Sequence, residues 1–318
     1  MKLFIIGNGF DKGHGLKTDY WDFRIFLNRC YPEFLYKFES KYNIYPGLDN
    51  EDKKNILWKE FEKNLANIEE DLIIENALSL DIGLESGDVG IEDTLYDYFS
   101  QELEYINKLP YYLKLWIQSI SIRDVQVNTN MINAKNKDMY INFNYTGVLE
   151  NVYKIDKSNI THIHGSLQKY DNDLVIGHGN HDKIEQIEEK INCDRIKQLC
   201  KKTTKAEGIL DEKEISIFRA IENYYLNTYK DVNLHKHKLW NLINKDIEEV
   251  IVIGHSVGEI DMPYFRDINA LLGQKPKWYI YYHKKNEKKI IHNNIRKCGV
   301  MEKQISMKET SKFYNVIY

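Results

Sequence analysis

Short, continuous apolar runs alternate along the chain with long stretches in which apolar residues recur every three or four positions. Continuous runs rich in β-branched and aromatic residues are typical of strands that are covered on both faces of a parallel sheet. The runs of this kind are Leu3–Ile6, Met139–Phe143, Ile160–Ile163, Leu174–Ile176, Val250–Ile253 and Trp278–Tyr282, with Phe313–Tyr318 as a further candidate. They predict an α/β protein with a mainly parallel sheet and helices on both of its faces.

The helical pattern is concentrated in two long segments between the strand candidates. The apolar positions that share one helical stripe are Leu57, Phe61, Leu65, Ile68, Leu72, Leu95, Phe99, Leu103 and Ile106 in the first segment, and Ile187, Ile191, Ile217, Ile221, Leu239 and Leu242 in the second. Residues 46–52 and 82–92 are rich in Gly, Asp and Glu and predict loops inside the first segment. We therefore expect one α/β domain over residues 1–318, built from discontinuous segments, with helical insertions at residues 24–125 and 182–247.

Polar residues follow several strand candidates at their carboxyl ends. These endings are Gly7-Asn8-Gly9-Phe10-Asp11, Asn144-Tyr145-Thr146, His164-Gly165-Ser166, Gly177-His178-Gly179 and Gly254-His255-Ser256-Val257-Gly258. The carboxyl ends of parallel strands meet at one edge of an open α/β sheet, and ligands bind at that edge. The glycines of the first ending suit a sharp turn into a helix, at which the backbone can approach a phosphate. Together the endings predict a nucleotide-binding site.

Composition and charge narrow the classes of function. Of the 318 residues, 42% are hydrophobic and 29% are charged, and the net charge of −4 favours neither nucleic acid nor an anionic membrane as a partner. No apolar stretch is long enough to span a bilayer, and residues 1–6 lack the apolar region of a signal peptide, so we expect a cytoplasmic protein. The four cysteines form no C-x-x-C pair, and the histidines lack a neighbouring set of carboxylates, so we expect no bound metal.

The motifs along the chain resemble those of the bacteriophage abortive infection AbiH family. The resemblance is carried by Ile5-Ile6-Gly7-Asn8-Gly9-Phe10-Asp11, His14-Gly15-Leu16, Tyr20-Trp21-Asp22-Phe23, Asn142-Phe143-Asn144-Tyr145-Thr146, His162-Ile163-His164-Gly165 and Ile253-Gly254-His255-Ser256. It covers nearly the whole chain, and the helical insertions are its least diagnostic parts. It implies an effector of phage defence.

The same motifs, in the same order, are remotely similar to sirtuin-like NAD-binding domains. Gly7-Asn8-Gly9 stands where sirtuins have their glycine loop, Asn144 where they have the asparagine of a Thr-Gln-Asn-x-Asp motif, His164-Gly165 at their His-Gly, and Gly254-His255-Ser256 at their Gly-Thr-Ser. The chain departs from that pattern at Asp11, where sirtuins commonly have Ser, and at Thr146, where they have Asp. It also lacks the paired cysteines of deacylating sirtuins, which favours NAD hydrolysis over protein deacylation.

The resemblance implies a Rossmann-like enzyme that takes NAD, or a related nucleotide, as its substrate, requires no further cofactor, and releases nicotinamide and ADP-ribose. Asn144 and His164 are the expected catalytic pair. The amide would hold a water or a ribose hydroxyl, and the imidazole, with an ordinary pKa of about 6.5, would take a proton. The expected ligand contacts are Gly7, Asn8, Gly9, Phe10, Asp11, Gly165, Gly254, His255, Ser256 and Asp261.

Such an enzyme harms the cell that makes it, so we expect its activity to be gated. The helical insertions are the expected place for assembly into a homo-oligomer, for binding of a phage-derived trigger, or for occlusion of the pocket. Their aromatic-rich faces, Tyr31, Phe34, Tyr36 and Phe38 and later Tyr224 and Tyr225, motivate this expectation.

Other interpretations of these residues stay open. The glycine loop can be a turn without a ligand, Asn144 an Asx cap and His164 a buried histidine bonded to the backbone. Asp261 can cap the helix expected near Pro263 instead of binding a sugar. His162 alternates with His164 along its strand, which favours a structural role.

Two other functions compete with the NAD hydrolase. A nucleotide sensor without catalytic activity would keep the glycine loop and would need no chemistry at Asn144 or His164. A serine hydrolase would use Ser256, because Gly254-His255-Ser256-Val257-Gly258 matches the G-x-S-x-G turn. The interpretation as a serine hydrolase gives no role to the N-terminal loop, Asn144 or His164.

Overall fold

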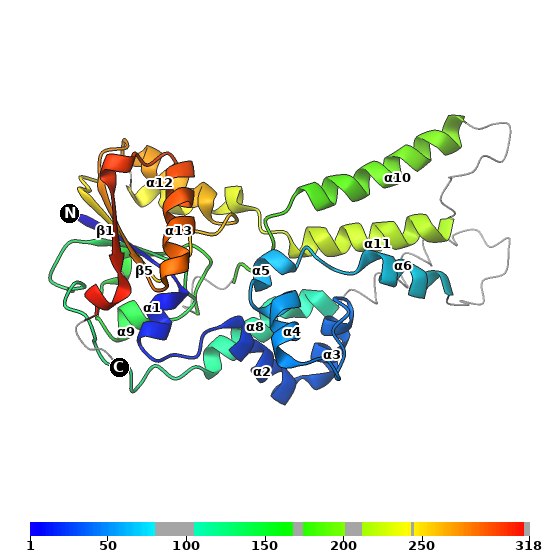
Figure 1. Ribbon diagram of the computed structural model, residues 1–318, viewed down its shortest axis with the longest axis horizontal. Helices are drawn as coiled ribbons and strands as arrows, with labels where there is room; N and C mark the ends of the chain where they lie inside the picture. The colour runs from blue at the N-terminus through cyan, green and yellow to red at the C-terminus, as the bar shows by residue number, and fades with distance from the viewer. Residues whose placement is uncertain (80–104, 168–173, 201–211, 243–244, 315–318) are drawn as a thin grey trace. The chain divides into compact units, whose positions relative to one another are not determined.

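The computed structural model describes residues 1–318 except 80–104, 168–173, 201–211, 243–244 and 315–318. The chain divides into two compact units (Figure 1). The sheet unit consists of Met1–Phe23, Leu113–Val175 and Asp231–Tyr318, and the helical unit of Arg24–Tyr112 and Ile176–Lys230. The helical unit thus begins at Arg24, where the first insertion is expected. Its two segments end at Tyr112 and Lys230, before the expected ends at residues 125 and 247.

A six-stranded, all-parallel sheet forms the centre of the sheet unit, which confirms the predicted α/β class. The strands are β1 (Lys2–Ile6), β2 (Met139–Asn142), β3 (Ile160–His162), β4 (Glu249–Ile253), β5 (Lys277–Tyr282) and β6 (Ile305–Glu309). Their order across the sheet is β3-β2-β1-β4-β5-β6. This is the Rossmann order, in which the chain builds outward from β1 in one direction and then in the other. The order reverses between β1 and β4.

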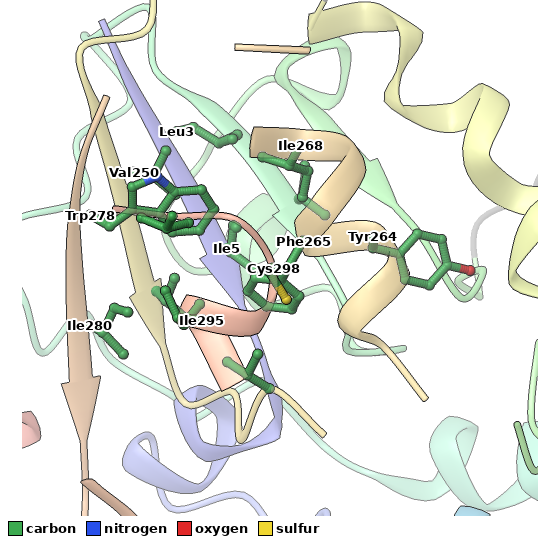
Figure 2. Packing of buried hydrophobic residues seen from close by; sticks show 14 of the residues in the cluster. Leu3, Ile5, Val250, Tyr264, Phe265, Ile268, Trp278, Ile280, Ile295 and Cys298 are labelled. Carbon is green, nitrogen blue, oxygen red and sulfur yellow. The ribbon is translucent and has the colours of Figure 1, made fainter. Parts of the chain in front are cut away.

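Both faces of the sheet are buried, which explains why most of the strands read as unbroken apolar runs. On one face Leu3, Ile5 and Val250 pack with residues of α12 (Met262–Leu271) and α13 (Lys285–Lys297), as Figure 2 shows. On the other face the side chains that alternate with these pack with α1 (Asn8–Gly13) and α9 (Val148–Asn151); they include Phe4, Ile6, Tyr140, Ile251 and Ile253. Truncating one large side chain in either layer to Ala costs about 2–5 kcal/mol.

The remaining helical elements are short in most cases. They are α2 (Tyr20–Cys30), α3 (Pro32–Ser40), α4 (Asn50–Lys53), the π-helix η1 (Lys54–Trp58), α5 (Phe61–Asn64), α6 (Glu70–Ser79), α8 (Leu109–Ser119), α10 (Asp182–Cys200), α11 (Glu212–Thr228), and the 3₁₀ turns η2 (Tyr105–Lys108), η3 (Lys157–Asn159), η4 (Val232–Leu242), η5 (Glu302–Gln304) and η6 (Thr310–Lys312). In the helical unit α10 and α11 lie side by side (Figure 1). Among the residues described, no helix has both the length and the apolar composition to cross a membrane.

Two of the predicted strands are absent from the described residues, and one observed strand was not predicted. Residues 174–176 form no strand; Val175 donates its N–H to the carbonyl of His164 outside the ladder. Of the candidate Phe313–Tyr318, residues 315–318 lie outside the described residues, and Phe313 is buried against the sheet without being part of it. The sixth strand is Ile305–Glu309. That strand lies at the edge of the sheet and is only partly buried, so it alternates polar and apolar residues and lacks the apolar run that marks the central strands.

The predicted helical stripe of the first insertion is buried but is not one helix. Leu57, Phe61, Leu65 and Ile68 all lie in the core, yet they are distributed over η1, α5 and the turn that follows it. The buried amide of Asn64 in α5 donates to the carbonyl of Leu57 in η1 at 3.3 Å, which joins the two elements. The loop expected at residues 46–52 ends where α4 begins at Asn50. The loop at 82–92 and the stripe positions 95, 99 and 103 lie outside the described residues.

Candidate functional site

The loops after β1 and β4 pack directly against each other at the point where the strand order reverses. Gly9 donates its N–H to the carbonyl of Gly254 at 2.8 Å, and Gly7 donates to the carbonyl of Ile253 at 3.0 Å. A Cβ on Gly254, whose φ is +68°, would lie 2.2 Å from the nitrogen of Phe10, and one on Gly7 would lie 2.6 Å from the carbonyl oxygen of Gly254. Glycine is therefore required at positions 7 and 254, because a side chain at either position would prevent the two loops from packing against each other.

Asn8 and Phe10, two predicted ligand contacts, have structural partners. The Asn8 side chain receives the Thr18 hydroxyl at 2.6 Å and donates to the carbonyl of the same residue at 2.9 Å. The Phe10 side chain is fully buried and packs on the rings of His14 and Tyr153 at 4.4 and 5.8 Å between centroids. The bonds of Asn8 thus hold the chain after α1 against the loop that follows β1. The Phe10 ring is part of the hydrophobic core beneath that loop.

Asp11 is a buried carboxylic acid in α1. Its Oδ2 accepts the hydroxyl of Thr146 at 2.5 Å. Burial raises the pKa of Asp11 to about 6, although hydrogen bonds from Thr146 and Asn144 and the charge of His162 lower it in part. The carboxyl is therefore half protonated near pH 6 and mostly ionised at pH 7. Its partner Thr146 is the other position at which the chain departs from the sirtuin pattern, so the two departures form one contact.

Asn144 is held against the glycine turn. Its side-chain amide donates to the carbonyl of Gly7 at 3.1 Å, and its own N–H donates to the side chain of Asn142 at 3.0 Å. The sequence-based prediction that Asn144 meets the first loop is consistent with this bond. The same bond has a structural role, because it gives the buried carbonyl of Gly7, just after β1, a hydrogen-bond partner.

His162 lies behind Asn144 and is part of a buried polar pair. Its Nδ1 lies 3.2 Å from the carbonyl oxygen of Asn144, and its Nε2 lies 2.7 Å from Glu150 in α9. Both side chains are almost completely buried. His162 thus has the structural surroundings expected from its alternation with His164. The sequence analysis did not identify Glu150, because none of the motifs contains it.

His164, His255 and Asp261 come together at the ends of β3 and β4. The Nε2 of His164 lies 3.4 Å from Oδ1 of Asp261, and the Nε2 of His255 lies 3.5 Å from Oδ2 of the same carboxylate. Asp261 occupies the N-cap position of α12, but its side chain makes no capping hydrogen bond. The carboxylate faces the two imidazoles instead. Within the described part of the chain, no set of three or more His, Cys, Asp or Glu side chains forms a metal site.

Aromatic rings enclose the two imidazoles. The Phe143 ring contacts His164 and His255 edge-on, with centroids 5.1 and 4.3 Å apart, and Phe265 approaches His255 to 5.0 Å. Tyr264 lies 5.9 Å from His164. His164 is only 4% exposed. The imidazoles therefore sit in a largely dry environment, in which an ionised partner acts more strongly than it would in water.

Ser256 does not occupy a strained elbow. A hydrolase nucleophile sits on a sharp turn between strand and helix. Here β4 ends at Ile253 and α12 begins only at Met262, and the residues with positive φ are Gly254 (+68°) and Val257 (+53°), not Ser256. Ser256 is exposed on this connection. This geometry gives no support to the serine hydrolase.

The predicted site residues fall into two groups along one edge of the sheet. Asn144, Asp11 and the turn after β1 form the first group, and His164, His255 and Asp261 form the second. Gly165, with φ of +82°, follows His164 and allows the chain to turn away from the sheet. His178, which follows the strand candidate at 174–176, belongs to the helical unit and is buried between Tyr225 and Tyr229.

One of three comparisons with known proteins returned a match. The family model described as "Bacteriophage abortive infection AbiH" matches residues 3–282, which include every strand but β6 and every predicted site residue. The comparisons with curated proteins and with solved structures returned no match. Since the family model spans most of the chain, this protein belongs to the bacteriophage abortive infection AbiH family.

Proposed function

We propose that this AbiH protein acts in abortive infection by hydrolysing NAD at the bond between nicotinamide and ribose. The observation that carries the proposal is the strand order. It places the polar ends of β3, β2, β1 and β4 next to one another, with the reversal between β1 and β4. In open α/β sheets, a dinucleotide binds outside the carboxyl ends of the strands at that reversal. The resemblance to sirtuin-like domains selects NAD among the dinucleotides.

The residues at this edge suit the chemistry. In the hydrolysis, the oxygen of water forms a bond to the anomeric carbon of ribose, the bond to nicotinamide breaks, and nicotinamide leaves as a neutral molecule. One proton of the water must be accepted. His164 supplies a base whose ordinary pKa lies near neutrality, and such a group contributes roughly 10²–10⁴-fold to the rate. The amide of Asn144 orients the water or a ribose hydroxyl. Neither step requires a metal or a further cofactor.

Chromatography of the products tests the proposal. Wild type, His164→Ala and Asn144→Ala are each incubated with NAD, NADP and ATP, and free nicotinamide is measured. The matched control is His292→Ala, because His292 is a histidine of the same unit that pairs with Glu302 on the surface of α13. We expect release of nicotinamide by wild type and by the control, and a loss of at least 100-fold in His164→Ala.

A cellular measurement covers the case in which the purified enzyme needs a trigger. Cells that express the wild type should lose NAD after phage infection, whereas cells that express His164→Ala should keep it. If neither purified protein nor infected cells consume NAD, the proposed activity is wrong.

One observation favours a second candidate, a nucleotide sensor without catalysis. The amide of Asn144 already has a partner in the carbonyl of Gly7, so it can hold the turn without touching a reacting atom. A sensor would bind NAD or ATP in calorimetry and form no product. We expect the affinity of such a sensor for the nucleotide to be unchanged in His164→Ala.

The helical unit is the proposed site of regulation. Its aromatic core, in which Trp58 stacks on Phe61 with centroids 4.8 Å apart, gives it a framework of its own. We assign to it the binding of a phage-derived trigger and the contacts of a homo-oligomer. Size-exclusion chromatography with light scattering, before and after addition of phage lysate, measures whether the oligomeric state follows the activity.

A further inference from the structure

Val257, in the connection between β4 and α12, has an unfavourable backbone conformation. Its φ is +53°, in the left-handed region that residues other than glycine seldom adopt. Of the four non-glycine residues with positive φ in the described part of the chain, Val257 alone is branched at Cβ, which makes this region still less favourable. Such a conformation persists only where the surrounding structure imposes it, and it is found most often at functional sites.

Two side chains hold the backbone of Val257, one on each side of the residue. Its N–H donates to Nδ1 of His255 at 2.9 Å, and its carbonyl accepts the side-chain amide of Asn294 at 2.9 Å. Asn294 lies in α13, 37 residues further along the chain. The Val257 side chain is fully buried in the core cluster that also contains Ile291 and Ile295 of that helix. Hydrogen bonds and packing together therefore impose the left-handed conformation.

The residues just before Val257 are among the expected ligand contacts. Gly254 packs against the loop after β1, where an added Cβ would lie 2.2 Å from the nitrogen of Phe10. His255 and the exposed Ser256 follow Gly254. They thus lie between two fixed points of the chain, the glycine contact on one side and the bond from Val257 to α13 on the other. So short a segment between fixed ends has few conformations available, and preorganisation of this kind favours binding.

We propose that Asn294 is a positioning residue of the nucleotide site, which holds the carbonyl of Val257 and thereby fixes the positions of His255 and Ser256. The inference rests on the proposed hydrolysis of NAD for its catalytic consequence. None of the sequence motifs contains Asn294, and it lies beyond residue 282, at which the family match ends. Asn294 acts through Val257 and does not touch the substrate. Without its amide, Val257 should relax toward negative φ and move Ser256 with it.

Hydrogen exchange of backbone amides, measured by NMR, tests the role of Asn294 without relying on activity. The samples are valine-labelled wild type, Asn294→Ala and the control Asn293→Ala, which truncates the exposed asparagine next to it. The resonance of Val257 is assigned with Val257→Ala, and Val252 in β4 is the internal reference. In Asn294→Ala the amide of Val257 should exchange at least about 10-fold faster than in wild type, because its bond to His255 opens locally. Val252 should keep its wild-type rate, and so should both amides in the control.

Two results of this measurement would overturn the inference. An unchanged rate at Val257 in Asn294→Ala means that Asn294 does not hold the turn. An equal acceleration at Val257 and Val252 means that Asn294 supports the fold as a whole and not this connection. Asn294→Asp, compared with Asn293→Asp, repeats the measurement with a side chain of the same size that lacks the donor.

The kinetics of nicotinamide release supply the second readout. Asn294→Ala should raise KM for NAD about 3- to 10-fold with little change in kcat, because contacts of His255 and Ser256 that hold the substrate and the transition state alike affect only KM. A wild-type KM in Asn294→Ala would contradict the role of the turn in binding. Selective acceleration at Val257, combined with a wild type that releases no nicotinamide, would uphold the role of Asn294 in the turn and refute the proposed hydrolysis.

Discussion

The hydroxyl of Thr146 donates to Oδ2 of Asp11 at 2.5 Å and so joins the chain after β2 to the helix after β1. The contact joins two elements that follow neighbouring strands, and it places the carboxyl of Asp11 in α1, where it is buried.

Asp11→Asn should change how stability depends on pH. The pKa of Asp11 is about 6 in the folded protein and 3.8 ordinarily, so the folded state holds the proton more tightly. Its stabilising contribution is therefore complete below about pH 4 and is lost as the pH rises through about 6. Between pH 4 and pH 7, the free energy of unfolding of Asp11→Asn should rise by about 2 kcal/mol relative to wild type. Urea denaturation at several pH values measures this, and parallel curves for the two proteins would contradict it.

Thr146→Val should destabilise the protein more at pH 7 than at pH 4. Valine removes the hydroxyl donor and leaves Oδ2 of the buried Asp11 without it. A hydrogen bond to an ionised group contributes about 1.5–3 kcal/mol, and one to a neutral group about 1 kcal/mol. A double-mutant cycle with Asp11→Asn isolates the pair. Costs that are equal at both pH values would mean that the ionised form of Asp11 does not depend on this bond.

Gly254→Ala should cost at least about 3 kcal/mol of unfolding free energy, because a Cβ at this positive φ would lie 2.2 Å from the nitrogen of Phe10. Gly258 is the matched control. Its φ is not positive, and the nearest atom to an added Cβ is Oγ of Ser256 at 3.8 Å. Gly258→Ala should leave stability unchanged or raise it by less than about 1 kcal/mol. Thermal and urea denaturation compare the two, and similar losses in both variants would refute this account of the turn.

Glu150→Leu should destabilise the fold by about 3 kcal/mol, because the buried Nε2 of His162 loses its partner. Glu150→Gln keeps an acceptor oxygen for the ring and should cost about 1 kcal/mol. The measurement is again the free energy of unfolding at pH 7. The pair would be unimportant to the fold if both variants stayed within 0.5 kcal/mol of wild type, roughly the limit for surface substitutions.

Ser256→Ala distinguishes a ligand contact from a nucleophile. A contact through one neutral hydrogen bond predicts that KM for NAD rises about 3- to 10-fold with little change in kcat. A nucleophile predicts loss of all activity, together with loss of labelling by a fluorophosphonate probe. We expect no labelling of the wild type, since Ser256 is not on a strained elbow. Labelling of the wild type that disappears in Ser256→Ala would support the interpretation as a serine hydrolase.

The central strands could be predicted from the sequence, because a strand covered on both faces must be apolar at consecutive positions, as in Leu3–Ile6 and Val250–Ile253. The edge strand Ile305–Glu309 could not be, because its partly buried residues need not be apolar. Leu174–Ile176 has the composition of a strand and no neighbour to pair with in the sheet. The composition of a segment indicates whether it is buried. A strand also requires a neighbouring strand with which its backbone can form hydrogen bonds.

For the candidate site, the sequence alone identified the polar strand ends, since parallel strands bring their carboxyl ends to one edge whatever the order of the strands. The order itself, and with it the contact between the glycines after β1 and β4, was decided by tertiary structure. So were the positions of Asp261 between two imidazoles and of Thr146 on Asp11. His164 and Asp261, like Asp11 and Thr146, are far apart along the chain, and only the packing of whole elements brings them within a few ångströms of each other.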